Sequence, residues 1–163
     1  MDFSRSLQDQ FAPRLTCFGC GPANEKGLQI KSFVQGDRVV CHFTPQPHHR
    51  AFGDESGAGM INGGIIGALL DCHLCWTGAY HLMVRRGLET PPCCVTAKYS
   101  VTFEQPTPVG KELILEAWVT GSSDRKAVVE GTLGTGDLIT ARGDGTFVSV
   151  KEGHPAYHRW GEA

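Results

Sequence analysis

The stretch GAGMINGGIIGALLDCHLCWTGAY, residues 57–80, decides the fold of this chain. From the paired glycines Gly63 and Gly64 onward, apolar residues occupy nearly every side of a helical repeat. A helix on the surface keeps a polar face, so this pattern predicts a helix inside the core. One carboxylate, Asp71, stands in the middle of the apolar run. Because burying an unpaired carboxylate is costly, Asp71 requires a partner, an open cavity or a chemical task.

The segments around this helix have the patterns of strands and loops. The helix itself is expected to end near Arg85, Arg86 and Gly87, a typical stop signal. The polar residues 45–60 predict a long loop, and Gly-Asp-Gly at 143–145 predicts a bulge or bend. Alternating or apolar runs predict the strands 28–34, 38–44, 95–104, 112–120, 126–134 and 139–150, and residues 4–11 a short helix. Either the sheet curls around the apolar helix or a partner covers the helix's other side.

Composition excludes several classes of protein. A chain of 163 residues is long enough for one domain with a sizeable core, and 40% hydrophobic residues with 20% charged residues are ordinary for a globular protein. The formal charge of −2 gives no reason to expect nucleic acid or a membrane surface as partner. Asp71 and His73 interrupt the most apolar segment, and the first residues lack the core of a signal peptide, so a cytoplasmic protein is expected.

Seven cysteines are present, and four of them form two C-x-x-C pairs, Cys17 with Cys20 and Cys72 with Cys75. One interpretation is a shared zinc site. The other is separate reduced thiols, of which Cys72 and Cys75 fill the core around the helix, because a free cysteine behaves as a small apolar residue. The pairs are far apart in the sequence and in different contexts, so separate thiols are favoured and no metal site is expected.

Three segments carry a resemblance to a known family. The segment INGGIIGALLD at 61–71 resembles the pattern of a hydrophobic residue, His-Gly-Gly, an apolar spacer and Leu-x-Asp in hotdog-fold acyl-CoA thioesterases of the phenylacetate type. The strand and turn VTAKYSVTFEQPTPVG at 95–110 and the loop CFGCGPANEKGLQI at 17–30 also resemble parts of that family. The resemblance implies an α+β hotdog fold, in which a curved antiparallel sheet wraps around one long central helix. The hotdog domain is then residues 17–151, between an N-terminal extension (1–16) and a C-terminal tail (152–163).

The resemblance also implies an activity and a set of catalytic residues. It implies hydrolysis of an acyl-CoA thioester by a homodimer or a dimer of dimers, with coenzyme A as part of the substrate and no other cofactor. In this family the amide at the helix start, here Gly63, holds the thioester carbonyl. A carboxylate of the partner's helix, here Asp71, acts as base or nucleophile. Thr96 stands where relatives have a Ser or Thr that orients the attacking water or carboxylate.

Two positions depart from the family pattern, and three more have a weaker implied role. Asn62 replaces the usual His before the glycines and still offers an amide donor, while Ser56 replaces an Asn or Gln seven residues before Gly63. Gly64 allows close approach of the substrate, and Arg125 and Lys126 stand where relatives place basic residues near the coenzyme phosphates. A non-hydrolytic acyl-thioester-binding protein and a hotdog dehydratase or lyase therefore stay open as alternatives.

The spacing of Gly63 and Asp71 carries an argument of its own. The first N–H groups of a helix suit a developing oxyanion, but eight residues at 1.5 Å each separate the two by about 12 Å. One helix cannot bring both groups to one carbonyl, whereas two antiparallel helices related by a two-fold axis can. The glycines and Asp71 are alternatively structural, with Asp71 bonded to a neighbouring hydroxyl. Thr96 is alternatively a solvent-facing residue, because it alternates with apolar neighbours, and Arg125 and Lys126 alternatively form a solvated turn.

Overall fold

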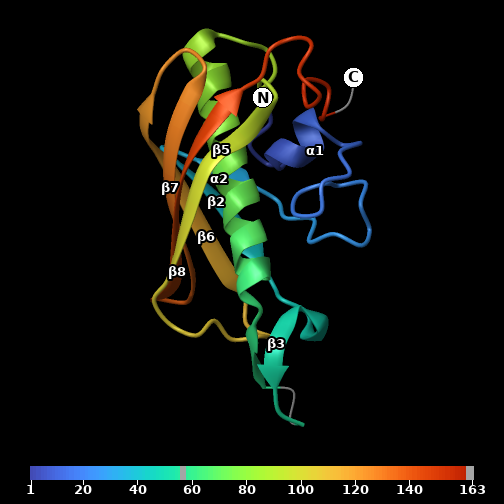
Figure 1. Ribbon diagram of the computed structural model, residues 1–163, viewed down its shortest axis with the longest axis vertical. Helices are drawn as coiled ribbons and strands as arrows, with labels where there is room; N and C mark the ends of the chain where they lie inside the picture. Colours follow the sequence, from blue (N-terminus) through green and yellow to red (C-terminus); the bar gives the residue numbers. More distant parts are fainter. Residues whose placement is uncertain (56–57, 161–163) are drawn as a thin grey trace.

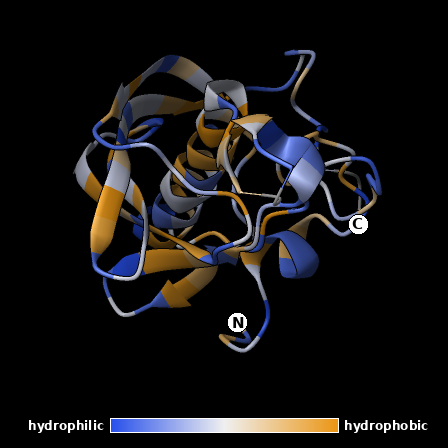
Figure 2. Cartoon of the chain, turned by 90° about the horizontal axis from the view of Figure 1, so that it is seen from below, coloured by the Kyte–Doolittle hydropathy of each residue, from blue (hydrophilic) through white to orange (hydrophobic). Residues whose placement is uncertain are grey.

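One long helix, α2 (Gly63–Arg86), lies along a six-stranded antiparallel sheet in the computed structural model, which describes residues 1–55 and 58–160 (Figure 1). The strand order is β1-β2-β6-β7-β8-β5. Seen along α2, the sheet curves around the helix (Figure 2). The predicted α+β fold is confirmed. The strands are β1 (Phe33–Gln35), β2 (Arg38–Phe43), β5 (Cys94–Phe103), β6 (Leu113–Ser122), β7 (Lys126–Thr135) and β8 (Leu138–Ser149).

Both ends of α2 are capped. At the start, the Asn62 side chain accepts a hydrogen bond from the Gly64 N–H, as N-cap residues do. At the end, Gly87 adopts a left-handed φ of 62° and its N–H bonds to the carbonyls of Met83 and Val84. The predicted end of the helix is therefore confirmed.

Glycines let the middle of α2 lie close to the sheet. Gly131 of β7 and Gly143 of β8 are cross-strand partners, and a Cβ on either would lie 3.0 or 3.5 Å from a methyl group of Leu74. No register shift occurs at 143–145 on either side of β8, so the predicted bulge there is wrong. The Gly-Asp-Gly run makes room for the helix instead.

The N-terminal segment and the C-terminal tail cover the face of α2 that the sheet leaves open (Figure 1). The segment contains the short helix α1 (Leu7–Phe11), and its Leu7 and Ile30 are buried in the core. Trp160 of the tail stacks on Trp76 of α2 with ring centroids 4.4 Å apart. One chain therefore covers α2 from two directions, with the sheet and with the terminal segments, an arrangement that the sequence did not suggest.

Two segments differ from the predicted secondary structure. Only the end of the predicted strand 28–34 pairs with a neighbour, because the chain before β1 crosses over α2. Residues 45–60, predicted as a loop, contain a 3₁₀ turn (Pro47–His49) and a small hairpin of β3 (Arg50–Gly53) and β4 (Gly59–Ile61). No helix in residues 1–55 and 58–160 is long and apolar enough to cross a bilayer.

Candidate active site

Asp71 lies in the middle of α2 and is held by a side chain of the sheet. Its Oδ1 accepts a hydrogen bond of 2.8 Å from the Thr96 hydroxyl. The carboxylate is half-buried, and this burial raises the pKa of Asp71 above its ordinary value, while the hydrogen bond from Thr96 opposes the shift. Asp71 thus has the partner that its apolar surroundings require, and it keeps access to the surface.

A β-bulge places Thr96 on the helix side of β5. Thr96 pairs with Phe147 and Lys98 with Thr146, so that Ala97 is an extra residue opposite β8. The extra residue shifts the alternation, and Tyr99, three positions later, also reaches the helix, donating a hydrogen bond of 2.9 Å to the Gly67 carbonyl. Thr96 is exposed in the single chain, as simple alternation suggested, but its hydroxyl also reaches the helix. No signal in the sequence marks Ala97 as a bulge.

The start of α2 exposes one backbone donor, the N–H of Gly63. Within the described part of the chain, no acceptor takes the N–H of Gly63. The N–H of Gly64 is already bonded to Asn62 Oδ1 at 2.8 Å. Because that oxygen must accept the Gly64 proton, the bond fixes the orientation of the Asn62 amide and leaves its Nδ2 end as a further donor. Ser56, the remaining residue predicted for this region, lies outside the described residues.

An apolar groove of about 390 Å³ adjoins the helix start. Its wall includes Gly63 itself, Ile66 on the next turn of α2, and Phe103 at the end of β5. The exposed Phe52 of the β3–β4 hairpin completes the lining on the other side. This groove suits an apolar group placed next to the Gly63 N–H.

Asp71 and the helix start stay apart within one chain. They are about 12 Å apart along the axis of α2, and β5 runs antiparallel to the helix, with Phe103 beside Gly63 and Thr96 beside Asp71. Gly67 lies midway between them, and a Cβ on Gly67 would meet no atom within 4 Å. The side of α2 between the two groups is therefore open in the single chain.

Comparison with known proteins identifies the family. The model of the thioesterase superfamily matches residues 58–141, which include the helix start, Asp71 and Thr96. The chain belongs to the thioesterase superfamily. Its fold is the hotdog fold that the sequence motif implied, so the resemblance is confirmed.

Relatives of this thioesterase-superfamily chain include solved structures. One is a thioesterase superfamily protein from Shewanella loihica PV-4, 32% identical, with 80% of this chain and 98% of that chain covered and a TM-score of 0.61. The PaaI protein of the phenylacetic acid degradation operon of E. coli is 16% identical, with 79% and 85% covered and a TM-score of 0.59, and shows the fold alone. A relative named "Uncharacterized protein, mitochondrial" from Candida albicans (strain WO-1) is 35% identical over 113 residues, 69% of this chain. The match spans 41% of that relative's length.

A basic cavity of about 860 Å³ lies at the far end of α2 from Gly63 in this thioesterase-superfamily chain. Arg86, Arg125 and Lys151 contribute its positive charge, which exceeds the negative charge of Glu89 and Glu152 in the same lining. Arg125 is fixed by a hydrogen bond of 2.9 Å from Nη2 to the Ser149 carbonyl. Lys126, the other basic residue singled out in the sequence, is exposed at the start of β7 and is not among the described residues that line this cavity.

Three of the four C-x-x-C cysteines converge behind Asp71. The sulfur atoms of Cys17, Cys20 and Cys72 lie within 4.8 Å of one another, because the loop that carries the first two packs across α2. Cys75 points elsewhere, with its sulfur 3.8 Å from the Cys94 carbonyl. All seven cysteines are free, and three of those expected to be separate lie together while Cys75 stands apart.

Proposed function

We propose that this thioesterase-superfamily chain hydrolyses an acyl-CoA thioester to a carboxylic acid and coenzyme A, at a site completed by a second copy of the chain. One observation carries the proposal. A carboxylate held by Thr96 and a helix-start N–H that has no acceptor among the described residues lie about 12 Å apart along α2, on either side of the open position at Gly67. Each is half of what hydrolysis of a thioester needs, namely a base or nucleophile and a donor for the oxyanion.

A two-fold axis near Gly67 would complete such a site. Two α2 helices that cross antiparallel at Gly67 place the Gly63 N–H of each copy next to Asp71 of the partner subunit. Gly67 has no side chain to keep the helices apart, and no atom of residues 1–55 or 58–160 fills the space beside it. The strand β5 is the last strand of the sheet, so its outer edge is available to pair with β5 of the second copy. The functional unit is then a dimer, alone or paired into a dimer of dimers.

The chemistry follows from these positions. The thioester carbonyl oxygen accepts the Gly63 N–H, and the Asn62 Nδ2 is a second donor to the charge that develops there. Asp71 of the partner subunit takes a proton from water as the water oxygen bonds to the carbonyl carbon. The C–S bond then breaks, and the proton passes to the departing sulfur. Alternatively, the carboxylate attacks the carbonyl carbon and the C–S bond breaks, so that coenzyme A leaves as the thiolate. Water then opens the resulting anhydride to the free acid and the Asp71 carboxylate, and a proton from that water goes to the thiolate. Thr96 orients the carboxylate in either case.

The two cavities suggest how the substrate lies. The groove beside Gly63 is apolar and suits the acyl group. The basic cavity with Arg125 and Lys151 suits the phosphates of coenzyme A. Arg86, in the wall of this cavity, is about 22 Å from Asp71 along the axis of α2. The substrate must therefore span this length of the helix. The pantetheine arm then extends along α2 of the subunit that supplies Asp71.

Release of thiol from a panel of acyl-CoAs tests the proposal. The wild-type protein is expected to cleave at least one member, and Asp71→Asn, which keeps the shape of the side chain, is expected to lose at least about a hundredfold in kcat. Asp137→Asn, in the exposed turn before β8, is the matched control and should cleave as the wild type does. If the folded wild type binds acyl-CoA and releases no thiol, the non-hydrolytic alternative is right and this proposal is wrong.

A further inference from the structure

The cluster of Cys17, Cys20 and Cys72 has the dimensions of a metal site. Cys17 Sγ and Cys72 Sγ are 3.8 Å apart, and the sulfur of Cys20 lies within 4.8 Å of both. Zinc binds cysteine sulfur at about 2.3 Å in tetrahedral geometry, which puts neighbouring sulfurs about 3.8 Å apart. A disulfide would require about 2.05 Å. The spacing therefore fits three ligands of one ion better than a bonded pair.

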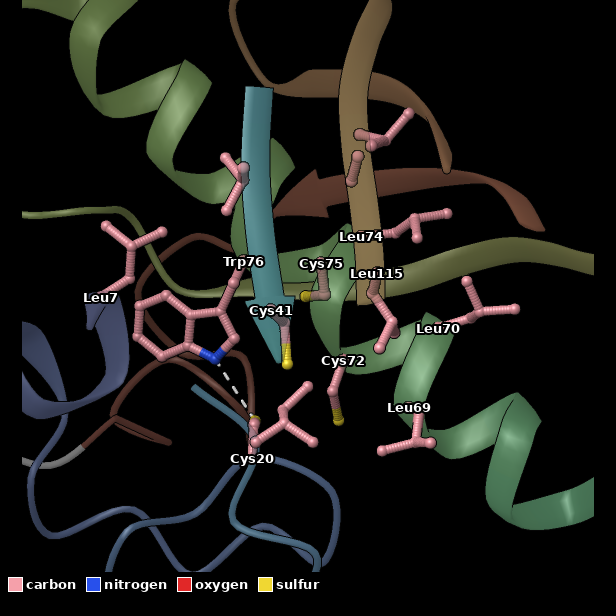
Figure 3. Close-up of a cluster of buried hydrophobic side chains, with 14 of the residues drawn as sticks. Leu7, Cys20, Cys41, Leu69, Leu70, Cys72, Leu74, Cys75, Trp76 and Leu115 are labelled. Carbon is pink, nitrogen blue, oxygen red and sulfur yellow. Dashed lines mark hydrogen bonds between the residues drawn. The ribbon is translucent and has the colours of Figure 1, made fainter. Parts of the chain in front are cut away.

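A hydrogen-bond donor and a positive group adjoin the sulfur atoms. The indole N–H of Trp76 donates to Cys20 Sγ at 3.3 Å (Figure 3). Such a donor stabilises negative charge on a sulfur that binds a metal. A positive group also faces the cluster: the half-buried guanidinium of Arg159, which is held by a hydrogen bond of 3.0 Å to the Cys94 carbonyl.

The loop is shaped closely around the cluster. A Cβ on Gly19 would lie only 2.4 Å from Cys72 Sγ, and a Cβ on Gly21 would lie 2.5 Å from the Cys17 nitrogen. The Gly21 N–H closes the turn by bonding to the Cys17 carbonyl at 2.9 Å. Only glycine fits at these two positions, because any side chain would push the loop sulfurs away from Cys72.

We propose that Cys17, Cys20 and Cys72 bind one thiophilic divalent cation, for which Zn²⁺ has the matching geometry. Three thiolates and Zn²⁺ carry a net charge of −1, which Arg159 offsets. Each cysteine that enters the site as a thiol releases its proton to solvent. Water fills the fourth tetrahedral position, because Cys17 is half-buried and borders the surface. The ion would tie residues 17–30 to α2 at the position next to Asp71.

A cadmium titration tests this site without reference to catalysis. Reduced, metal-free protein is titrated with Cd²⁺ under anaerobic conditions, and the ultraviolet absorption of the sulfur-to-cadmium charge transfer is followed. We expect saturation at one ion per chain, and loss of the signal when Zn²⁺ competes. Cys17→Ser and Cys72→Ser should each weaken binding by at least about a hundredfold, and Trp76→Phe by about tenfold. Cys93→Ser, another half-buried cysteine, is the matched control and should bind as the wild type does.

Three results would overturn the proposal. The first is a folded, fully reduced wild-type protein that takes up no Cd²⁺. The second is Cd²⁺ uptake that is unchanged in Cys17→Ser. Because Cys17 is half-buried and Cys72 is buried, Cys17→Ser disturbs the fold less than Cys72→Ser does, and near-ultraviolet circular dichroism checks that it is folded. The third is a disulfide between Cys17 and Cys72 in protein isolated without reductant, together with no metal uptake after reduction, which would make the cluster a redox pair.

Discussion

The hydroxyl of Thr96 donates a hydrogen bond of 2.8 Å to Oδ1 of Asp71, linking the edge strand β5 to the middle of α2. Thr96 is solvent-exposed in the single chain and Asp71 is half-buried, so the pair sits where the surface meets the core. A hydrogen bond to a charged group contributes roughly 1.5–3 kcal/mol. The bond therefore has the strength to fix the direction in which the carboxylate points.

Removal of that hydroxyl is expected to slow hydrolysis. Thr96→Val keeps the branched shape and removes the donor, so kcat should fall about tenfold or more while the protein stays folded. Thr96→Ser keeps the donor and should stay within about threefold of the wild type. The measurement is thiol release from the best acyl-CoA of the panel. Equal rates for the Val and Ser variants would show that Thr96 has no part in positioning Asp71.

A shared active site predicts that two inactive variants restore each other. Gly63→Pro removes the helix-start N–H, and proline is well tolerated at the first position of a helix. Asp71→Asn removes the carboxylate. A mixed dimer of the two variants contains one intact site, with Gly63 from one copy and Asp71 from the other.

The readout of this complementation is activity after mixing. Random reassortment of equal amounts should recover about a quarter of the wild-type rate, because half of the dimers are mixed and each has one working site. Gly63→Ala keeps the N–H and is the control, since a Cβ there would meet only the ring of the exposed Phe103 at 3.4 Å. If activity is not recovered although exchange of subunits is verified, the Gly63 N–H and the Asp71 carboxylate do not share one site across the dimer.

The sequence predicted the helix and most of the sheet because their signals are local. Apolar periodicity marked α2, and the pair of arginines before Gly87 marked its end. The placement of Thr96 beside Asp71 agrees with the family resemblance but could not be derived from strand alternation, because it depends on the bulge at Ala97, where the register between two strands shifts. The effect of a bulge on the direction of a side chain appears only once both strands are paired.

Sequence patterns also could not predict two long-range features. These are the packing of both terminal segments on α2 and the cluster of three cysteines. Cys20 and Cys72 are separated by 51 residues in the sequence, and only the packing of the loop across the helix brings them together. Long-range contacts of this kind depend on the whole fold, whereas turns, caps and periodicity depend on a few neighbours.

Trp160 is expected to stabilise the fold although it lies in the tail. Its ring stacks on Trp76 with an interplanar angle of 15°, and only 6% of its surface is exposed. Trp160→Ala should lower the free energy of unfolding by about 3 kcal/mol, as large-to-small substitutions of buried aromatic residues do. Tyr157→Ala, in the same tail but 37% exposed, is the control and should cost less than about 1 kcal/mol. Urea denaturation measures both, and equal losses would contradict a structural role for the Trp76–Trp160 stack.

Acid should destabilise the protein through His73, which is fully buried in α2. Its Nε2 lies 3.0 Å from the Val39 carbonyl and its Nδ1 lies 2.9 Å from the Ser32 hydroxyl. Ser32 Oγ in turn accepts a hydrogen bond from the Gln8 amide. This chain of contacts suits a neutral ring that donates from Nε2 and accepts at Nδ1, because the Ser32 proton is then directed at the ring. Burial lowers the pKa of His73 to about 4.

The sign of the pH effect follows from that shift. Between about pH 4 and pH 6.5 the unfolded chain binds a proton at His73 and the folded chain does not, so stability falls as the pH falls through this range. The loss due to His73 should reach about 2 kcal/mol at pH 5 relative to pH 7.5. Urea denaturation at both pH values should show a smaller difference for His73→Asn, despite a lower stability overall, than for the wild type. His154→Gln, an exposed histidine of the tail, should keep the wild-type difference. An unchanged pH dependence in His73→Asn would mean that other groups account for the acid sensitivity.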